Sequence, residues 1–164
     1  MSKWYEFTEF GPSFYETAAF RVVHTISIDA TAEKVFETLE DPEAWPKWIP
    51  MVKRVEWTSP KPFEVGTTRT VIMKNGYRID ERFILWEQNR RMSFTVLGAS
   101  VPGLTSFGED YLLTPTATGC ELQWTFALQP RGFLAQGLYL AYPAFRLALK
   151  KTLKDLKRVV ERRA

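Results

Sequence analysis

Four polar side chains interrupt strand patterns that are otherwise apolar, and they are the residues of this sequence best suited to chemistry. His24, Arg69, Glu81 and Glu109 each fall in an alternating stretch, on the side that carries the apolar residues. Burying a charge without a partner is costly, so a charged residue on an apolar face is rarely accidental. A glutamate held in apolar surroundings has a raised pKa and can act as a general acid or base.

Arg69 and Glu81 are predicted to meet across a hairpin. Asn75-Gly76 is a strong two-residue turn signal between two alternating runs, and pairing outward from it brings Arg69 near Glu81 or Arg82. One interpretation is a buried ion pair with a structural role. The other is a pair that binds the polar end of a small apolar ligand, or that places a proton donor for a dehydration.

The sequence contains no pattern typical of a metal site or of a nucleotide-binding site. His24 is the only histidine and Cys120 the only cysteine, so a zinc site would need carboxylates as its remaining ligands. His24 is either a hydrogen-bonded core residue or a catalyst. No GxGxxG or P-loop motif is present to hold phosphates, and we predict neither a metal nor a cofactor.

The cellular setting is predicted from what the sequence lacks. A lone cysteine cannot form an internal disulfide, which favours a reducing compartment, and we expect the protein to be cytoplasmic. The N-terminal residues, interrupted by Glu6, Glu9 and Gly11-Pro12, are not typical of a signal peptide. No apolar run approaches the roughly 18 residues that a membrane-spanning helix needs.

The elements that position these residues follow from hydrophobic periodicity. Residues 1–19 lack a period and are predicted to be an extended arm, whereas residues 20–164 form a single domain. Residues 29–41 predict a short helix, and DPEAWPKWIP at 41–50 predicts a second short turn of helix limited by its prolines. A long amphipathic helix is predicted from Pro143 to Arg162. Alternation predicts seven strands, at 20–28, 52–57, 67–73, 77–87, 90–100, 104–114 and 120–129.

This order of elements, strand, two short helices, six strands and long helix, resembles the SRPBCC superfamily, the START-like or birch-pollen-allergen-like proteins. The resemblance rests on ISIDATAEKVFETLEDPEAWPKWIP, VGTTRT, ERFILWEQNRRMSF, LTPTATGCELQW and LKKTLKDLKRVVE, and is strongest to the polyketide cyclase/dehydrase group. It implies an α+β helix-grip fold, in which a seven-stranded curved antiparallel sheet wraps around the long C-terminal helix. It also implies a cavity between the sheet and that helix.

The resemblance implies binding or carriage of a hydrophobic small molecule, such as a lipid, an isoprenoid or an aromatic polyketide. The residues expected to line the cavity are His24, Trp45, Trp48, Phe83, Phe94, Trp124 and Tyr142. Trp45 and Trp48 either gate the ligand or fill the core beneath the short helices. The alternative is a polyketide cyclase or dehydratase, in which Glu81, Arg69 and Glu109 would be catalytic. A protein-interaction role has no positive feature in the sequence.

The basic charge of the chain is concentrated at its C-terminal end. Residues 146–164 carry eight Lys and Arg against Asp155 and Glu161, a net charge of +6, whereas the remaining 145 residues have a net charge of −3. This segment lacks base-stacking aromatics or a reading motif, so no nucleic acid partner is predicted. The charges form either a solvated helix face or a peripheral contact with an anionic membrane.

Overall fold

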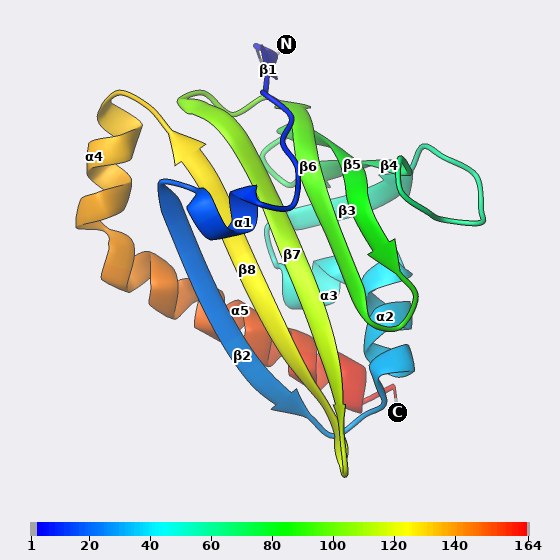
Figure 1. Cartoon of the computed structure of the whole chain (residues 1–164). Coiled ribbons are helices and arrows are strands. Elements are labelled where there is room, and N and C mark those ends of the chain that lie inside the picture. The colour runs from blue at the N-terminus through cyan, green and yellow to red at the C-terminus, as the bar shows by residue number, and fades with distance from the viewer. Residues whose placement is uncertain (1–2, 164) are drawn as a thin grey trace.

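A curved antiparallel sheet crossed on one face by a long C-terminal helix makes up the body of the protein (Figure 1). The computed structural model describes residues 3–163, so the first two residues of the predicted arm and the last residue of the predicted domain lie outside the described residues. This architecture confirms the helix-grip fold that the resemblance to the SRPBCC superfamily implies.

The sheet has eight strands, of which seven form a continuous path in the order β2-β8-β7-β6-β5-β4-β3. From β3 onward each strand pairs with the next in sequence, through short turns such as Asn75-Gly76 and, between β3 and β4, through the longer loop of residues 58–67. Strand β2 closes the path by pairing with β8 at the far edge. The strands are β1 (Tyr5–Glu6), β2 (Phe20–Ile28), β3 (Val52–Trp57), β4 (Thr68–Met73), β5 (Arg78–Glu87), β6 (Arg91–Ala99), β7 (Leu104–Thr116) and β8 (Gly119–Pro130).

Two short helices close one end of the sheet. Helix α2 (Ala32–Glu40) begins at Thr31, whose side chain accepts a hydrogen bond from the backbone N–H of Lys34 at 3.3 Å. Helix α3 (Trp45–Trp48) is a single turn, with Pro46 inside it and Pro50 just beyond it. Arg163 pairs with Asp41 at 2.6 Å and so ties the end of the long helix to the junction of α2 and α3.

The C-terminal segment is two helices and not one. The long helix predicted from Pro143 to Arg162 is confirmed as α5 (Tyr142–Glu161), and the structure adds a separate helix directly before it, α4 (Phe133–Leu140), which the sequence did not predict. Proline at the start of α5 lacks a backbone N–H, so the helical hydrogen bonding changes there. Helix α5 buries Leu153, Leu156 and Val160 against the sheet, whereas α4 projects beyond the body (Figure 1).

The N-terminal arm is built into the sheet. Strand β1 pairs with the end of β6, and the backbone N–H groups of Phe7 and Thr8 then donate to Leu97 and Thr105 at 2.9 and 2.7 Å. The arm therefore fills the gap where β6 and β7 diverge. It continues into α1 (Phe14–Thr17), which lies on the outer face of the sheet, opposite α5 (Figure 1).

Candidate functional site

Arg69 and Glu81 form a buried ion pair on the inner face of the sheet. They are register partners on β4 and β5, as the hairpin predicts, and Arg69 Nε donates to Glu81 Oε2 at 2.5 Å. Arg69 is 1% exposed and Glu81 4% exposed. Burial raises the pKa of the Glu81 carboxyl, against the opposing effect of the adjacent guanidinium.

Aromatic rings enclose the rest of the Arg69 guanidinium. Its Cζ lies 4.1 Å from the ring centroid of Trp45 and 5.0 Å from those of Phe83 and Phe94. Such contacts stabilise the cation but accept no hydrogen bond along the plane of the group. Nη1 and Nη2 have no acceptor among residues 3–163, so a charged group with several donors is held in the interior by one hydrogen bond.

Glu109 is the second buried carboxyl on this face. Its Oε2 accepts a hydrogen bond from the hydroxyl of Tyr111 and another from Trp124 Nε1 at 3.0 Å. Burial, which is the largest effect, and the charge of Glu81 raise the pKa of Glu109 to about 7, although both hydrogen bonds and Arg69 oppose the shift. Near neutral pH this carboxyl can therefore both take up and release a proton.

Trp45 and Trp48 lie in the core between the two buried glutamates. Trp45 packs on Arg69, the partner of Glu81, and Trp48 packs on Trp124, which donates a hydrogen bond to Glu109. Their ring centroids are 4.8 Å apart, and Trp48 lies 6.2 Å from Trp124. Trp45 Nε1 donates to the carbonyl of Leu39 at 2.9 Å, whereas Trp48 Nε1 is buried with no acceptor among the described residues. The geometry thus places both tryptophans inside as packing for the short helices, with Trp45 against Arg69 and Trp48 against Trp124.

The structure brings eight of the ten predicted site residues into this inner cluster and places His24 near it, at the edge of α5. Six are joined by their contacts with one another, and Glu109 is joined to them through Trp124, which packs on Trp48; the six are Arg69, Glu81, Trp45, Trp48, Phe83 and Phe94. His24 is the register partner of Trp124, but its Nε2 lies 2.8 Å from the carbonyl oxygen of Arg146 on α5. Tyr142 packs on Phe20, 5.4 Å between centroids, and its hydroxyl donates to the carbonyl of Arg21.

Trp57 is a member of the cluster that pattern reading missed. It is the register partner of Arg69 on β3, and its ring centroid lies 5.5 Å from the Arg69 Cζ. Phe63 stacks on its other side with centroids 4.0 Å apart. The sequence did contain a signal for this contact. The turn-rich residues 58–67 join the end of β3 to the start of β4, and antiparallel pairing of these strands brings Trp57 beside Arg69.

Trp57 also lines a surface hollow of about 480 Å³ between α2 and the loop of residues 58–67. Its other lining residues include Glu37, Glu40 and Lys61. Trp57 Nε1 donates to the carbonyl of Glu40 at 3.0 Å. One aromatic side chain therefore contacts both this hollow and the buried arginine.

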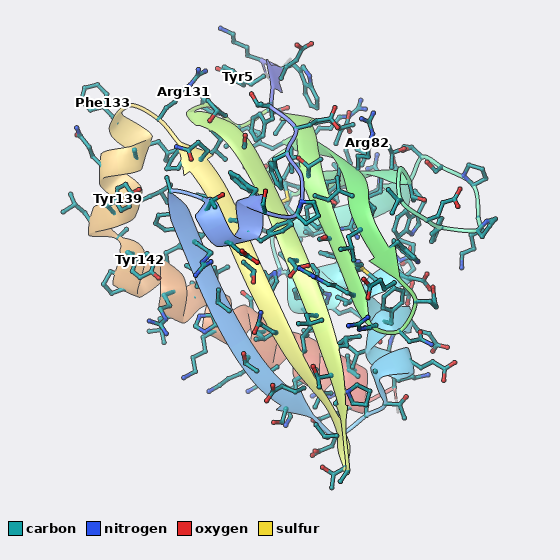
Figure 2. The ribbon with its side chains drawn as sticks, in the orientation of Figure 1. Tyr5, Arg82, Arg131, Phe133, Tyr139 and Tyr142 are labelled. Carbon is teal, nitrogen blue, oxygen red and sulfur yellow. The ribbon has the colours of Figure 1, made fainter. Side chains whose placement is uncertain are left out.

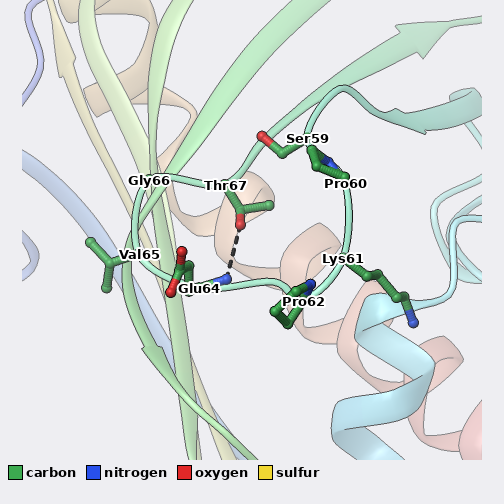
Figure 3. Close-up of a pocket in the computed structure, with 8 residues that line it drawn as sticks. All are labelled: Ser59, Pro60, Lys61, Pro62, Glu64, Val65, Gly66 and Thr67. Atoms are coloured by element: carbon green, nitrogen blue, oxygen red, sulfur yellow. Dashed lines mark hydrogen bonds between the residues drawn. The ribbon is translucent and has the colours of Figure 1, made fainter.

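The loop itself encloses a second hollow of about 400 Å³ (Figure 3). Residues 59–62 and 64–67 line it, and the backbone N–H of Glu64 donates to Thr67 Oγ1 at 2.9 Å. None of the predicted site residues contributes to it. We therefore regard it as a feature of the loop and not as the site.

Within residues 3–163, no group of three or more His, Cys, Asp and Glu side chains is arranged to hold a metal ion. No helix among these residues is both long and apolar enough to cross a membrane.

The fold and the polar cluster on its inner face define the class: this is a protein of the SRPBCC superfamily, in which a curved sheet grips a C-terminal helix. The chain belongs to the family described as "Polyketide cyclase / dehydrase and lipid transport", which matches residues 19–161.

Comparisons with known proteins agree with this assignment. An uncharacterized protein of Mycobacterium tuberculosis is 40% identical over 153 residues, which cover 93% of this chain and 92% of that protein. A conserved protein of Geobacillus kaustophilus has a similar structure, with a TM-score of 0.69 at 18% identity over 87% of this chain and 96% of that one. Ara h 8.0201 has a TM-score of 0.62 at 13% identity over 86% and 97% of the two chains. The two structural likenesses concern the fold alone.

Proposed function

We propose that the protein binds a mostly apolar small molecule on the inner face of the sheet, with an oxygen atom of that molecule accepting hydrogen bonds from Arg69. The observation that carries this proposal is the pair of buried Arg69 nitrogens, Nη1 and Nη2, that have no acceptor among the described residues. A buried charged donor without a partner is expensive, so such a group is retained where something else supplies the acceptor.

The charges favour a neutral oxygen over a carboxylate. Glu81 already balances Arg69, and Glu109 carries a partial negative charge near neutral pH. An added anion would leave net negative charge in the interior, whereas a carbonyl or hydroxyl oxygen adds none. A ketone-bearing or quinone-like apolar molecule fits these donors and the aromatic walls, and the family description concerns polyketides and lipids.

Entry past Trp57 is part of the proposal. The hollow beside Trp57 lies between α2 and the loop that carries Phe63, and Trp57 contacts Arg69 on its other side. A rotation of Trp57 with a displacement of the loop would connect this hollow with the surroundings of Arg69. Loops that cover binding sites commonly move in this way.

The test is native mass spectrometry of protein purified gently from its own cells, with extraction and identification of any molecule that remains bound. The wild type should carry a stoichiometric apolar molecule with a carbonyl or hydroxyl oxygen. The double variant Arg69→Met/Glu81→Met removes both charges together, so it should fold and lose that molecule.

The matched control is Arg91→Met, which removes an arginine from the other face of the sheet and should leave the bound molecule in place. Wild-type protein that stays empty, both as purified and after incubation with a total small-molecule extract of the cells, would contradict the proposal. Equal loading of wild type and double variant would contradict the role of Arg69.

A second candidate function is a cyclase or dehydratase for polyketide-like substrates. The raised pKa of Glu109, about 7, favours it, because a buried carboxyl that titrates near neutral pH can transfer protons while Arg69 polarises a carbonyl. Glu109→Gln keeps the shape of the side chain and removes the titration. An enzyme should then bind the extracted molecule but fail to convert it, and Glu81→Gln tests the other carboxyl in the same way. A carrier should bind it and convert nothing in either form.

A further inference from the structure

Helix α4 presents apolar side chains to solvent. None of its eight residues is buried, and Phe133 and Leu140 are 90% and 86% exposed. Tyr139 and, on α5, Leu147 are 53% and 68% exposed. Figure 2 shows Phe133 projecting away from the sheet at the far end of α4. Four of the seven exposed large hydrophobic residues in the described chain are therefore gathered on these two helices.

Helix α4 is held against the body by contacts of its opposite side, so Phe133 and Leu140 need not be buried to fix its position. The Tyr139 hydroxyl donates to the carbonyl of Ala19 at 2.8 Å, and its ring packs on Phe20 with centroids 5.9 Å apart. Leu134 lies directly against Gly103 in the turn between β6 and β7. The helix is thus fixed to the body on one side, and Phe133 and Leu140 remain free on the other.

Basic residues without acidic neighbours in the sequence flank α4 and continue along α5. Residues 130–154 contain five basic residues and no Asp or Glu. All five, Arg131, Arg146, Lys150, Lys151 and Lys154, are exposed, and only Lys151 pairs with a carboxylate within residues 3–163. Leu147, Lys151 and Lys154 are spaced at i, i+4 and i+7, so they share one face of α5. We call these five basic side chains, together with Phe133, Leu140 and Leu147, the α4–α5 surface.

We propose that the α4–α5 surface docks onto an anionic phospholipid bilayer. Phe133 and Leu140 would enter the boundary between headgroups and acyl chains, while the basic side chains contact lipid phosphates, as in other amphipathic helices that lie in a membrane interface. The charge complementarity selects this occupant. A second copy of the same surface would bring two sets of five positive charges together, which opposes a symmetric dimer.

The experiment is co-sedimentation of the full chain with vesicles of phosphatidylcholine alone and of phosphatidylcholine mixed with phosphatidylglycerol. The wild type should bind the mixed vesicles, bind the neutral ones much more weakly, and be released by added salt. Phe133→Ser/Leu140→Ser should weaken binding about tenfold or more, since two large side chains no longer enter the bilayer. Lys150→Glu/Lys154→Glu should remove the preference for the anionic vesicles.

The controls use exposed residues elsewhere on the molecule. Met51→Ser/Val65→Ser removes two exposed apolar side chains, and Lys53→Glu/Lys74→Glu makes the same change of charge. Both should bind as the wild type does. Absence of binding to mixed vesicles would overturn the proposal, as would equal losses in the controls, equal binding to neutral vesicles, or self-association that buries Phe133 and excludes lipid. The result does not depend on whether the interior binds a ligand.

Discussion

Glu109 and Asp110 are neighbours on β7, yet their side chains lie on opposite faces of the sheet in opposite situations. On the outer face Asp110 accepts two hydrogen bonds from Arg91, from Nε to Oδ1 at 2.9 Å and from Nη2 to Oδ2 at 3.2 Å. On the inner face Arg69 gives Glu81 one hydrogen bond, and Glu109 accepts from Tyr111 and Trp124 without an arginine hydrogen bond.

The difference in hydrogen bonding distinguishes Arg91 and Asp110, a structural ion pair, from Arg69 and Glu81, which we propose as part of a binding site. The two-point contact of Arg91 with Asp110 is the geometry that arginine and carboxylate prefer, and the rest of the Arg91 side chain is 30% exposed. Arg69 instead leaves two buried donors, Nη1 and Nη2, without an acceptor among residues 3–163. The buried hydroxyls of Ser93 and Thr95 on the outer face also have no hydrogen-bond partner in this part of the chain, but they are neutral, and leaving them unpaired costs less than leaving a guanidinium unpaired.

The largest expected effect comes from breaking one pair on each face. Arg69→Met alone leaves Glu81 buried and unpaired, and we expect a loss of about 3–5 kcal/mol in the free energy of unfolding. Arg69→Met/Glu81→Met should recover most of that loss because no buried charge remains. Arg91→Met also leaves a buried carboxyl, that of Asp110, without its arginine, but the site is open to water on the Arg91 side, so we expect a smaller loss of about 1–2 kcal/mol. Chemical denaturation measures all three, and equal costs for the two single variants would erase the contrast between the faces.

The next effect concerns the pH dependence of stability. The pKa of Glu109 rises from 4.5 to about 7 on folding, so between these values the folded state binds the proton more tightly than the unfolded state. This contribution to stability is fully present below pH 4.5 and is lost as the pH rises through 7, by about 3 kcal/mol at most. The free energy of unfolding of the wild type minus that of Glu109→Gln should therefore fall over this range.

The comparison residue for this measurement is Asp110 on the other face. Burial also raises the pKa of Asp110, but Arg91 and its hydrogen bonds oppose the shift. The difference between wild type and Asp110→Asn should change less over the same range of pH. A flat difference for Glu109→Gln would mean that this carboxyl is better solvated or better paired than its contacts indicate.

Much of the fold was predictable because it depends on local signals. Alternation located the seven strands of the main sheet path, and the Asn75-Gly76 turn placed Arg69 opposite Glu81, as the register confirms. Thr31 near the start of the first short helix is of a residue type that commonly caps helices, and its side chain does accept the capping hydrogen bond. Each of these inferences spans a few residues or one hairpin, where spacing alone determines the geometry.

The remainder depends on contacts between residues far apart in the sequence. Which rings surround Arg69 is decided by the curvature of the sheet and by the position of α3, and neither has a local signal. The separate helix α4 was missed because its apolar residues continue the period of α5 although none of them is buried. The arm was predicted only as an extended segment, because its fit between β6 and β7 depends on where those strands diverge.

The smallest effect tests how the outer face is closed. Tyr15 on α1 is 4% exposed, and its hydroxyl donates to the carbonyl of Phe94 at 2.7 Å, over a position where Gly108 leaves room for the ring of Phe10. Tyr15→Phe keeps the ring and removes that donor, so we expect a loss of about 1 kcal/mol in the free energy of unfolding. The amount of molecule bound inside should not change, because Phe94 presents its ring to Arg69 and only its backbone to Tyr15. If Tyr15→Phe emptied the interior as Arg69→Met/Glu81→Met is expected to do, the two faces would be coupled through β6. The arm would then be part of the binding site and not only its cover.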